Sequence, residues 1–187
     1  MQTSIFKKIL FFSCFLALIL VINSCDDTTT PPLPTNDEEL ITSVKVELKD
    51  SATGQILNYY FRDLDGEGGN PPTQWDTLVL LPNRTYYTVV RFLNESNPNN
   101  IINVSTEIKN EQTDHIICYK ESSTGTIITR TDSDGLYPLG LESKWVTGSI
   151  SNGDITITLK HQQGIKNGSC DPGETDVEVK FQCKIKL

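Results

Sequence analysis

Residues 175–187 read TDVEVKFQCKIKL, and apolar and polar side chains alternate along the whole stretch. Successive side chains of an extended strand point to opposite faces, so its apolar members share one face. Alternation of this length is typical of a strand with one buried and one solvated face, as in antiparallel sheets. The stretch therefore predicts a long strand in an all-β domain. Its apolar face consists of Val177, Val179, Phe181, Cys183 and Ile185.

The same pattern recurs through the chain. SVKVELK (43–49) and DITITLK (154–160) repeat the alternation, and TYYTVVRFL (85–93) is apolar on both faces, as expected of a more central strand. Turn signals such as the Asn-Gly pair of SNGD (151–154) separate these candidates. Shorter candidate strands are ILNYYF (56–61), TLVLL (77–81), HIICYK (115–120), GTIITR (125–130) and SKWVTGSI (143–150).

One segment departs from the strand pattern. In residues 101–115 the apolar side chains recur at helical spacing, and Ser105 or Thr106 could cap a helix there. We expect a short helix over about 105–114 that connects two strands. About eight or nine strands with one helix predict an immunoglobulin-like antiparallel β-sandwich spanning residues 40–187.

The N-terminus has the layout of a lipoprotein signal. Lys7 and Lys8 precede an apolar run, ILFFSCFLALILVI (9–22), whose 14 residues suit a signal peptide better than a membrane-spanning helix. Small Ser24 stands directly before Cys25 in the sequence INSC, the pattern of a bacterial lipobox. We therefore expect a signal peptide over 1–24 and acylation of Cys25, which would anchor the protein to a membrane. The alternative is an ordinary secretory signal followed by an incidental cysteine.

Composition beyond the signal limits the partners. Of 16 Lys and Arg, two lie in the signal, which leaves 14 basic against 24 acidic residues and a net charge of −10. This balance repels phosphate backbones and argues against nucleic-acid binding. Residues 25–39 are rich in Thr, Pro and acids and have almost no large apolar side chain, so they predict a flexible tether.

Three cysteines, Cys118, Cys170 and Cys183, lie in the predicted domain. An exported domain meets an oxidising compartment, so one disulfide is expected with one cysteine left over. If 175–183 is a single strand of about 26 Å, a Cys170–Cys183 bond is near the limit of its reach. We therefore favour a Cys118–Cys183 disulfide, against the alternative that all three are thiols.

The loop FRDLDGEGGNPPTQWD (61–76) offers a candidate calcium site. Asp63, Asp65 and Glu67 are hard oxygen ligands, and the glycines among them permit a tight turn. The closing acid of a calcium loop is missing, because Gln74 occupies that position and Asp76 follows two residues late. The other interpretation is a glycine-rich interstrand loop with solvated acids.

A second candidate site could hold zinc or copper, which are less favoured than calcium in the loop. Glu111 and His115 fall four residues apart, so a continuous helix would align them on one face. His161 closes a predicted strand, and a composite site of Glu111, His115 and His161 would need these segments to meet in the fold. The alternative is that both histidines are ordinary surface or structural residues.

Catalytic signatures are missing from the sequence. It contains no G-x-S-x-G elbow, phosphate loop, H-E-x-x-H or dinucleotide fingerprint. Trp75, Trp145 and Tyr137 could form a sugar-stacking platform, although aromatic residues of a sandwich also fill its core or rim. We therefore predict a noncatalytic protein.

Several motifs together resemble small lipoproteins of Bacteroidota: DLDGEGG, NRTYYTVVRFLNE, DHIICY, WVTGSISNGDITITLKH and GETDVEVKF. The resemblance covers most of the chain beyond the signal. It implies a lipid-anchored protein of the outer membrane, facing the periplasm or the cell surface, with a binding role accessory to a TonB-dependent receptor. A structural or adhesive envelope protein with a calcium-stabilised loop is the alternative.

Overall fold

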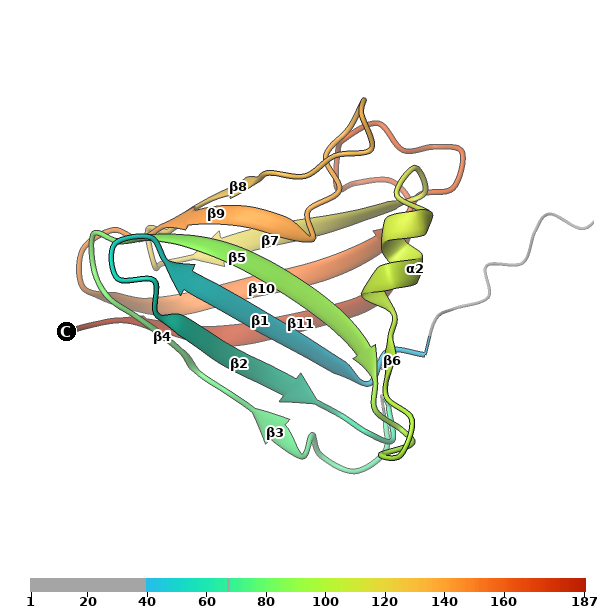
Figure 1. Cartoon of the computed structure of the whole chain (residues 1–187), viewed down its shortest axis with the longest axis horizontal. Helices are drawn as coiled ribbons and strands as arrows, with labels where there is room; N and C mark the ends of the chain where they lie inside the picture. Colours follow the sequence, from blue (N-terminus) through green and yellow to red (C-terminus); the bar gives the residue numbers. More distant parts are fainter. Residues whose placement is uncertain (1–39, 67) are drawn as a thin grey trace, which may run out of the picture. The chain divides into compact units, whose positions relative to one another are not determined.

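The computed structural model describes residues 40–66 and 68–187. The predicted signal peptide (1–24), the tether with Cys25 (25–39), and Glu67 lie outside these residues, so their assignments stay predictions. The described residues fold into two β-sheets and one short helix (Figure 1). The predicted all-β sandwich with one short helix is confirmed for this part of the chain.

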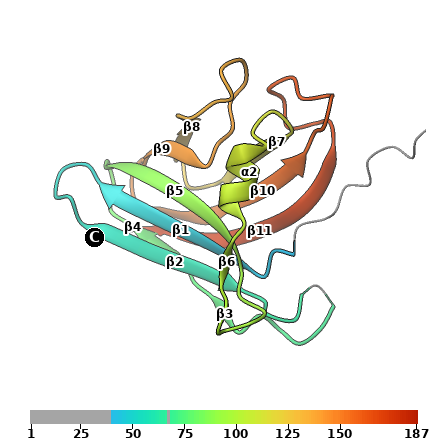
Figure 2. The same ribbon diagram turned by 45° about the vertical axis from the view of Figure 1, so that its right-hand side comes forward.

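The larger sheet has seven strands, six of them in the order β3–β2–β1–β5–β9–β8, while β6 pairs with the end of β5. The smaller sheet has the order β4–β11–β10–β7. Figures 1 and 2 show the two sheets lying face to face. Neighbouring strands are antiparallel, except that β4 runs parallel to β11. The strands of the larger sheet are β1 (Ser43–Asp50), β2 (Ile56–Arg62), β3 (Gln74–Trp75), β5 (Thr85–Asn94), β6 (Ile102–Asn103), β8 (Ile127–Arg130) and β9 (Glu142–Val146). Those of the smaller sheet are β4 (Leu78–Leu80), β7 (His115–Ser122), β10 (Ser151–His161) and β11 (Glu174–Ile185).

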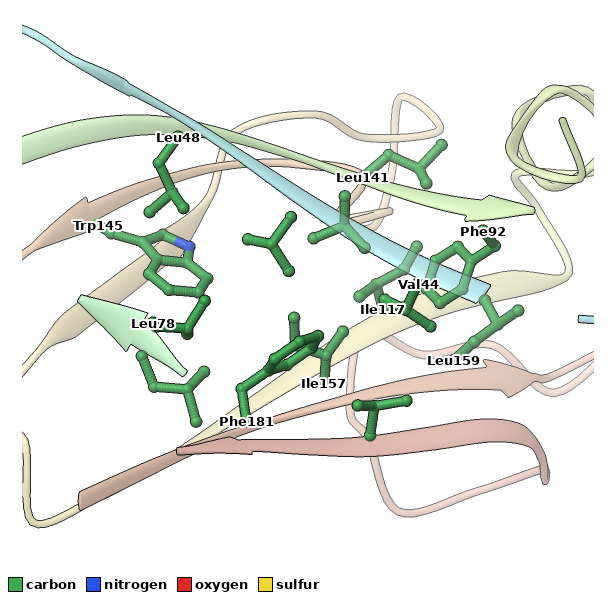
Figure 3. Close-up of a cluster of buried hydrophobic side chains, with 14 of the residues drawn as sticks. Val44, Leu48, Leu78, Phe92, Ile117, Leu141, Trp145, Ile157, Leu159 and Phe181 are labelled. Atoms are coloured by element: carbon green, nitrogen blue, oxygen red, sulfur yellow. The ribbon is translucent and has the colours of Figure 1, made fainter. Parts of the chain in front are cut away.

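The alternating apolar residues of the sequence form the core between the sheets (Figure 3). Val44, Val46 and Leu48 of β1 point inward from the larger sheet, and each is almost completely buried. Ile157 of β10 and Phe181 of β11 face them from the smaller sheet. Each such side chain contributes roughly 1.5–3 kcal/mol when fully buried, which explains why a period-2 pattern decides this fold.

The helix is shorter than predicted. Helix α2 spans Ser105–Asn110 rather than 105–114, and residues 111–114 form a turn that leads into β7. The expected cap is also wrong, because Val104 is the N-cap residue and makes no side-chain cap. The Ser105 hydroxyl instead accepts a hydrogen bond from the Phe92 amide at 2.7 Å, which ties the helix to β5.

The favoured disulfide is wrong. Cys118 bonds to Cys170, with a Cα–Cα distance of 6.0 Å, and Cys183 is a buried free thiol. Cys183 cannot reach Cys118 because the two point to opposite faces of the smaller sheet. Cys183 follows Val179 and Phe181 on the inner face, whereas Cys118 pairs with outward-facing Thr158. The segment 162–173 carries Cys170 to the outer face.

Candidate metal centre

Three ligand-type side chains meet where the strands of the smaller sheet end. His115 is the first residue of β7, His161 is the last residue of β10, and Asp176 lies near the start of β11. One ligand atom from each lies within 4.8 Å of the other two. Helix α2 lies at this same end of the sandwich (Figure 1). The meeting of the two histidines, which a composite site requires and the sequence could not show, occurs in the structure, and the Asp176 carboxylate lies beside them.

Strand register brings the two histidines together. His161 and His115 are direct partners in the antiparallel pairing of β10 with β7. Their rings make an edge contact, with centroids 4.7 Å apart and an interplanar angle of 72°. His161 continues the inner face of Leu159 and Ile157, so both rings lie at the margin of the core.

A β-bulge turns Asp176 toward the histidines. Leu159 pairs with Val177, but the next residue of β10, Lys160, pairs with Thr175, which leaves Asp176 as the extra residue. A bulge bends the strand and re-aims a side chain, so the alternation that places Val177 inward does not send Asp176 outward. Sequence reasoning missed Asp176 for this reason, since the uninterrupted pattern assigns it to the solvated face.

Gly173 allows β11 to begin so close to His161. Its φ is +88°, and a Cβ at this position would lie 2.1 Å from the main-chain oxygen of His161. Only glycine can adopt this positive φ and also lie this close to the His161 main-chain oxygen. The Pro-Gly pair ahead of β11 is thus the sequence signal that accompanies the bulge.

The environment of His115 favours the neutral ring. His115 is completely buried, and its Nδ1 lies 3.2 Å from the main-chain oxygen of Glu111. A carbonyl can only accept, so this bond assigns the proton to Nδ1 and leaves the lone pair on Nε2. Burial lowers the pKa of His115, and the neighbouring His161 lowers it further, against the opposing effects of Glu111 and Asp176. A neutral imidazole whose second nitrogen donates to a carbonyl is the usual state of a metal-ligating histidine.

Glu111 supports the site through its backbone. Its side chain is exposed, and α2 has ended before it, so the predicted helical alignment of Glu111 with His115 does not form. The Glu111 carboxylate is not part of the group of neighbouring ligand atoms, which contains Asp176 instead, and Glu111 contacts His115 through its main-chain oxygen.

Two imidazole nitrogens and one carboxylate oxygen suit zinc. Zinc accepts such mixed sets, with a fourth position left for water or another ligand, and copper also binds imidazole. Calcium prefers six to eight oxygen ligands and does not match this set. In a tetrahedral zinc site neighbouring ligand atoms lie roughly 3.4 Å apart, so the side chains would have to approach by up to about 1.4 Å.

The segment 162–173, which joins His161 to Asp176, is held at several points. The buried Gln162 amide donates to the carbonyls of Ser169 at 2.9 Å and Pro172 at 2.8 Å, closing the segment on itself. Lys166 donates to the Gln112 carbonyl at 2.6 Å and to Asp134 at 2.8 Å. The Cys118–Cys170 disulfide adds a covalent link to β7. These contacts preorganise the connection between two of the three ligands.

In the acidic loop between β2 and β3, the side chains form hydrogen bonds within the loop itself. The Asp65 carboxylate accepts hydrogen bonds from the amide and the side chain of Asn70, at 2.9 and 2.6 Å. Burial raises the pKa of Asp63, and a hydrogen bond with Asp65 and its charge raise it further. Glu67 lies outside the described residues, so the calcium interpretation of this loop stays a prediction.

No helix among the described residues is long and apolar enough to cross a membrane. A comparison of the chain with protein families, curated proteins and solved structures finds no match.

Proposed function

We propose that this chain is a noncatalytic, lipid-anchored binding protein of the cell envelope. Its proposed ligand is a metal ion, and zinc is the preferred candidate. The observation that carries the proposal is the convergence of His115, His161 and Asp176 at one end of the smaller sheet, with ligand atoms within 4.8 Å. The signal and lipobox pattern ending at Cys25 supports the anchor, and the resemblance of the motifs to Bacteroidota lipoproteins favours an outer-membrane location.

Two further observations support metal binding. The Nε2 atom of His161 is buried and has no hydrogen-bond partner among the described residues, which costs free energy that a metal would recover. The bulge and Gly173 have no evident use in an ordinary strand, yet together they bring Asp176 to the histidines. The competing explanation is a structural cluster that binds no metal, in which the Asp176 carboxylate only stabilises the two imidazole rings.

Metal analysis tests the proposal. The protein is purified in detergent and its zinc, copper and nickel contents are measured, followed by calorimetric titration with zinc. We expect about one zinc per chain, strongly reduced binding in His161→Ala and Asp176→Asn, and unchanged binding in Glu174→Gln. Glu174 is the matched control because it is an exposed acid that pairs with His161 across β10 and β11. Equal, weak zinc binding by the wild type and Asp176→Asn would leave only the structural explanation.

Anchoring has its own test. A Cys25→Ser variant should lose its acyl chains by mass spectrometry and leave the membrane fraction, because the anchor supplies the hydrophobic contact. Protease treatment of intact cells would then distinguish exposure at the surface from the periplasm. An accessory role to a TonB-dependent receptor predicts that deletion of the protein impairs that receptor's uptake of its nutrient.

The second candidate is a structural or adhesive envelope protein with a calcium-stabilised loop. It is favoured by one observation, the adjacent carboxylates of Asp63 and Asp65, whose mutual repulsion a cation would relieve. Millimolar calcium should then raise the melting temperature, and an Asp63→Asn variant should lose the increase. An unchanged melting temperature in calcium would remove this candidate without affecting the zinc site.

A further inference from the structure

A second feature lies where Trp75 and the segment from β3 to β4 approach Lys180 of β11. It is a cleft of about 530 Å³ lined by Trp75, Asp76, Thr77, Asp154, Lys180 and Gln182. We propose that this cleft, with the Trp75 indole as its apolar wall, binds a neutral carbohydrate. The proposal goes beyond the metal-binding function and rests on different residues.

Trp75 is exposed and yet held in place. Its side chain is 56% accessible, whereas Trp145 is completely buried in the core. The indole Nε1–H donates to the Lys180 carbonyl at 3.2 Å, and the ring packs edge-on against Phe61 at 5.4 Å. An exposed aromatic ring with a fixed orientation gives a flat surface at little entropic cost on binding. The three-residue platform considered as a possibility from the sequence does not form, because Trp145 belongs to the core.

The polar lining suits hydroxyl groups. Lys180 and Asp154 form an ion pair at 3.2 Å with side chains 62% and 31% exposed, so both keep capacity for a ligand. Thr77 and Gln182 add side chains that can donate and accept. Asp76 has a structural role instead, because its carboxylate accepts hydrogen bonds from the Tyr60 main-chain amide at 2.8 Å and from the Gln74 side chain.

Charge and shape select among ligand classes. The cleft contains two carboxylates and one ammonium group, which disfavours phosphate and other anions. A sugar ring offers an apolar C–H face to an indole and hydroxyls that pair with donors and acceptors alike. We therefore assign the cleft to neutral pyranose sugars rather than to charged metabolites.

An extended peptide is the competing occupant, because β4 pairs with β11 only over Cys183–Ile185. A peptide could add to the preceding part of that edge by main-chain pairing. However, the Trp75 indole already bonds to the carbonyl of Lys180 and lies across this edge. A new strand would have to displace it, whereas a sugar would stack upon it.

Native affinity electrophoresis tests the proposal with four neutral polysaccharides (laminarin, xylan, galactomannan and starch) and one acidic one, polygalacturonate. The detergent-solubilised full protein should be retarded by at least one neutral polymer and not by the acidic one. Trp75→Ala should weaken that retardation at least about tenfold, and Trp75→Phe should be intermediate because it keeps an aromatic ring. Tyr87→Ala is the matched control, since Tyr87 is also 56% exposed but is absent from the cleft lining.

Fluorescence provides an independent readout, because only Trp75 of the two described tryptophans is exposed. Oligosaccharides of the retarding polymer should protect this fluorescence from acrylamide quenching. Retardation that survives Trp75→Ala, or no retardation by any of the four neutral polymers, overturns the proposal. Saturable binding of a ten-residue Thr/Val peptide, without polysaccharide binding, also overturns it and assigns the edge to peptides. Melting temperatures of all variants confirm that they are folded.

Discussion

Removal of the Cys118–Cys170 disulfide should cost stability and metal affinity together. The bond closes a loop with a sequence separation of 52 residues, and this loop contains β8, β9 and β10. In the chain-entropy treatment, such a closure restricts the unfolded chain by about 14 cal/mol/K, or about 4 kcal/mol at 25 °C. For a domain of this size the expected decrease in melting temperature is roughly 8–16 °C.

The assay compares the wild type, a Cys118→Ala/Cys170→Ala variant and a Cys183→Ala control by thermal unfolding with and without dithiothreitol. Reduction should destabilise the wild type and Cys183→Ala by the same amount, because the control keeps the disulfide. It should leave the double variant unchanged. Zinc affinity should fall in the double variant, since Cys170 lies in the segment that joins His161 to Asp176.

Thiol chemistry checks the pairing directly. Burial raises the pKa of Cys183 to about 12, so its thiol should react with alkylating reagents only after unfolding. A nonreduced digest should yield a Cys118–Cys170 peptide. The reasoning is refuted if the digest yields Cys118–Cys183, or if the double variant loses less than about 1 kcal/mol of unfolding free energy.

Three other predictions concern the same end of the sandwich. Gly173→Ala should destabilise the protein at least about 1 kcal/mol more than Gly164→Ala in urea unfolding, because both have positive φ but only the Gly173 Cβ would meet the backbone. The buried Asp134–Lys166 pair should make the protein acid-sensitive. Burial alone would raise the pKa of Asp134, but hydrogen bonds led by that from Lys166 hold it at about 2, below its ordinary 3.8. Between pH 3.8 and about pH 2 the unfolded state therefore binds more protons than the folded state. About 2 kcal/mol of folding stability should be lost as the pH falls through this range. The Asp134→Asn variant should not show this loss. Removal of zinc with EDTA should lower the melting temperature of the wild type by roughly 5–10 °C if zinc was present at about 100 times its Kd, and should leave Asp176→Asn unaffected.

Apolar patterns and turn signals were sufficient to predict the strands, because both are local properties of the sequence. All nine strands expected from the sequence are present, and the two additional strands, β3 and β6, have only two residues each. The pairing of His115 with His161 was only a hypothesis at that stage, because register between strands far apart in the chain is set by tertiary packing. The prediction of the disulfide was wrong for a related reason, since the sheet face to which Cys118 points depends on that register.

The position of Asp176 beside the two histidines could not be predicted from the sequence. A bulge moves one residue out of the alternation, and its position depends on how closely Gly173 can approach His161. The Pro-Gly signal marks a turn but does not say that the following strand begins with an extra residue. Local sequence patterns were therefore sufficient for the fold class, whereas the position of Asp176 beside the histidines depended on a backbone irregularity.

The two proposed sites share strands but should act independently. Asp154 and His161 are seven residues apart on β10, which corresponds to about 23 Å along an extended strand. The candidate metal ligands lie at the margin of the inner face, whereas Asp154 of β10 and Lys180 of β11 line the cleft beside Trp75. Between them lies the fully buried core row of Ile155, Ile157 and Leu159, which is close-packed and has no evident second arrangement. Coupling between sites requires an element with two states that both ligands bias, and none is visible in the described strands. The two proposed sites would therefore act as separate surfaces on one rigid support, so loss of one proposed activity should leave the other unchanged.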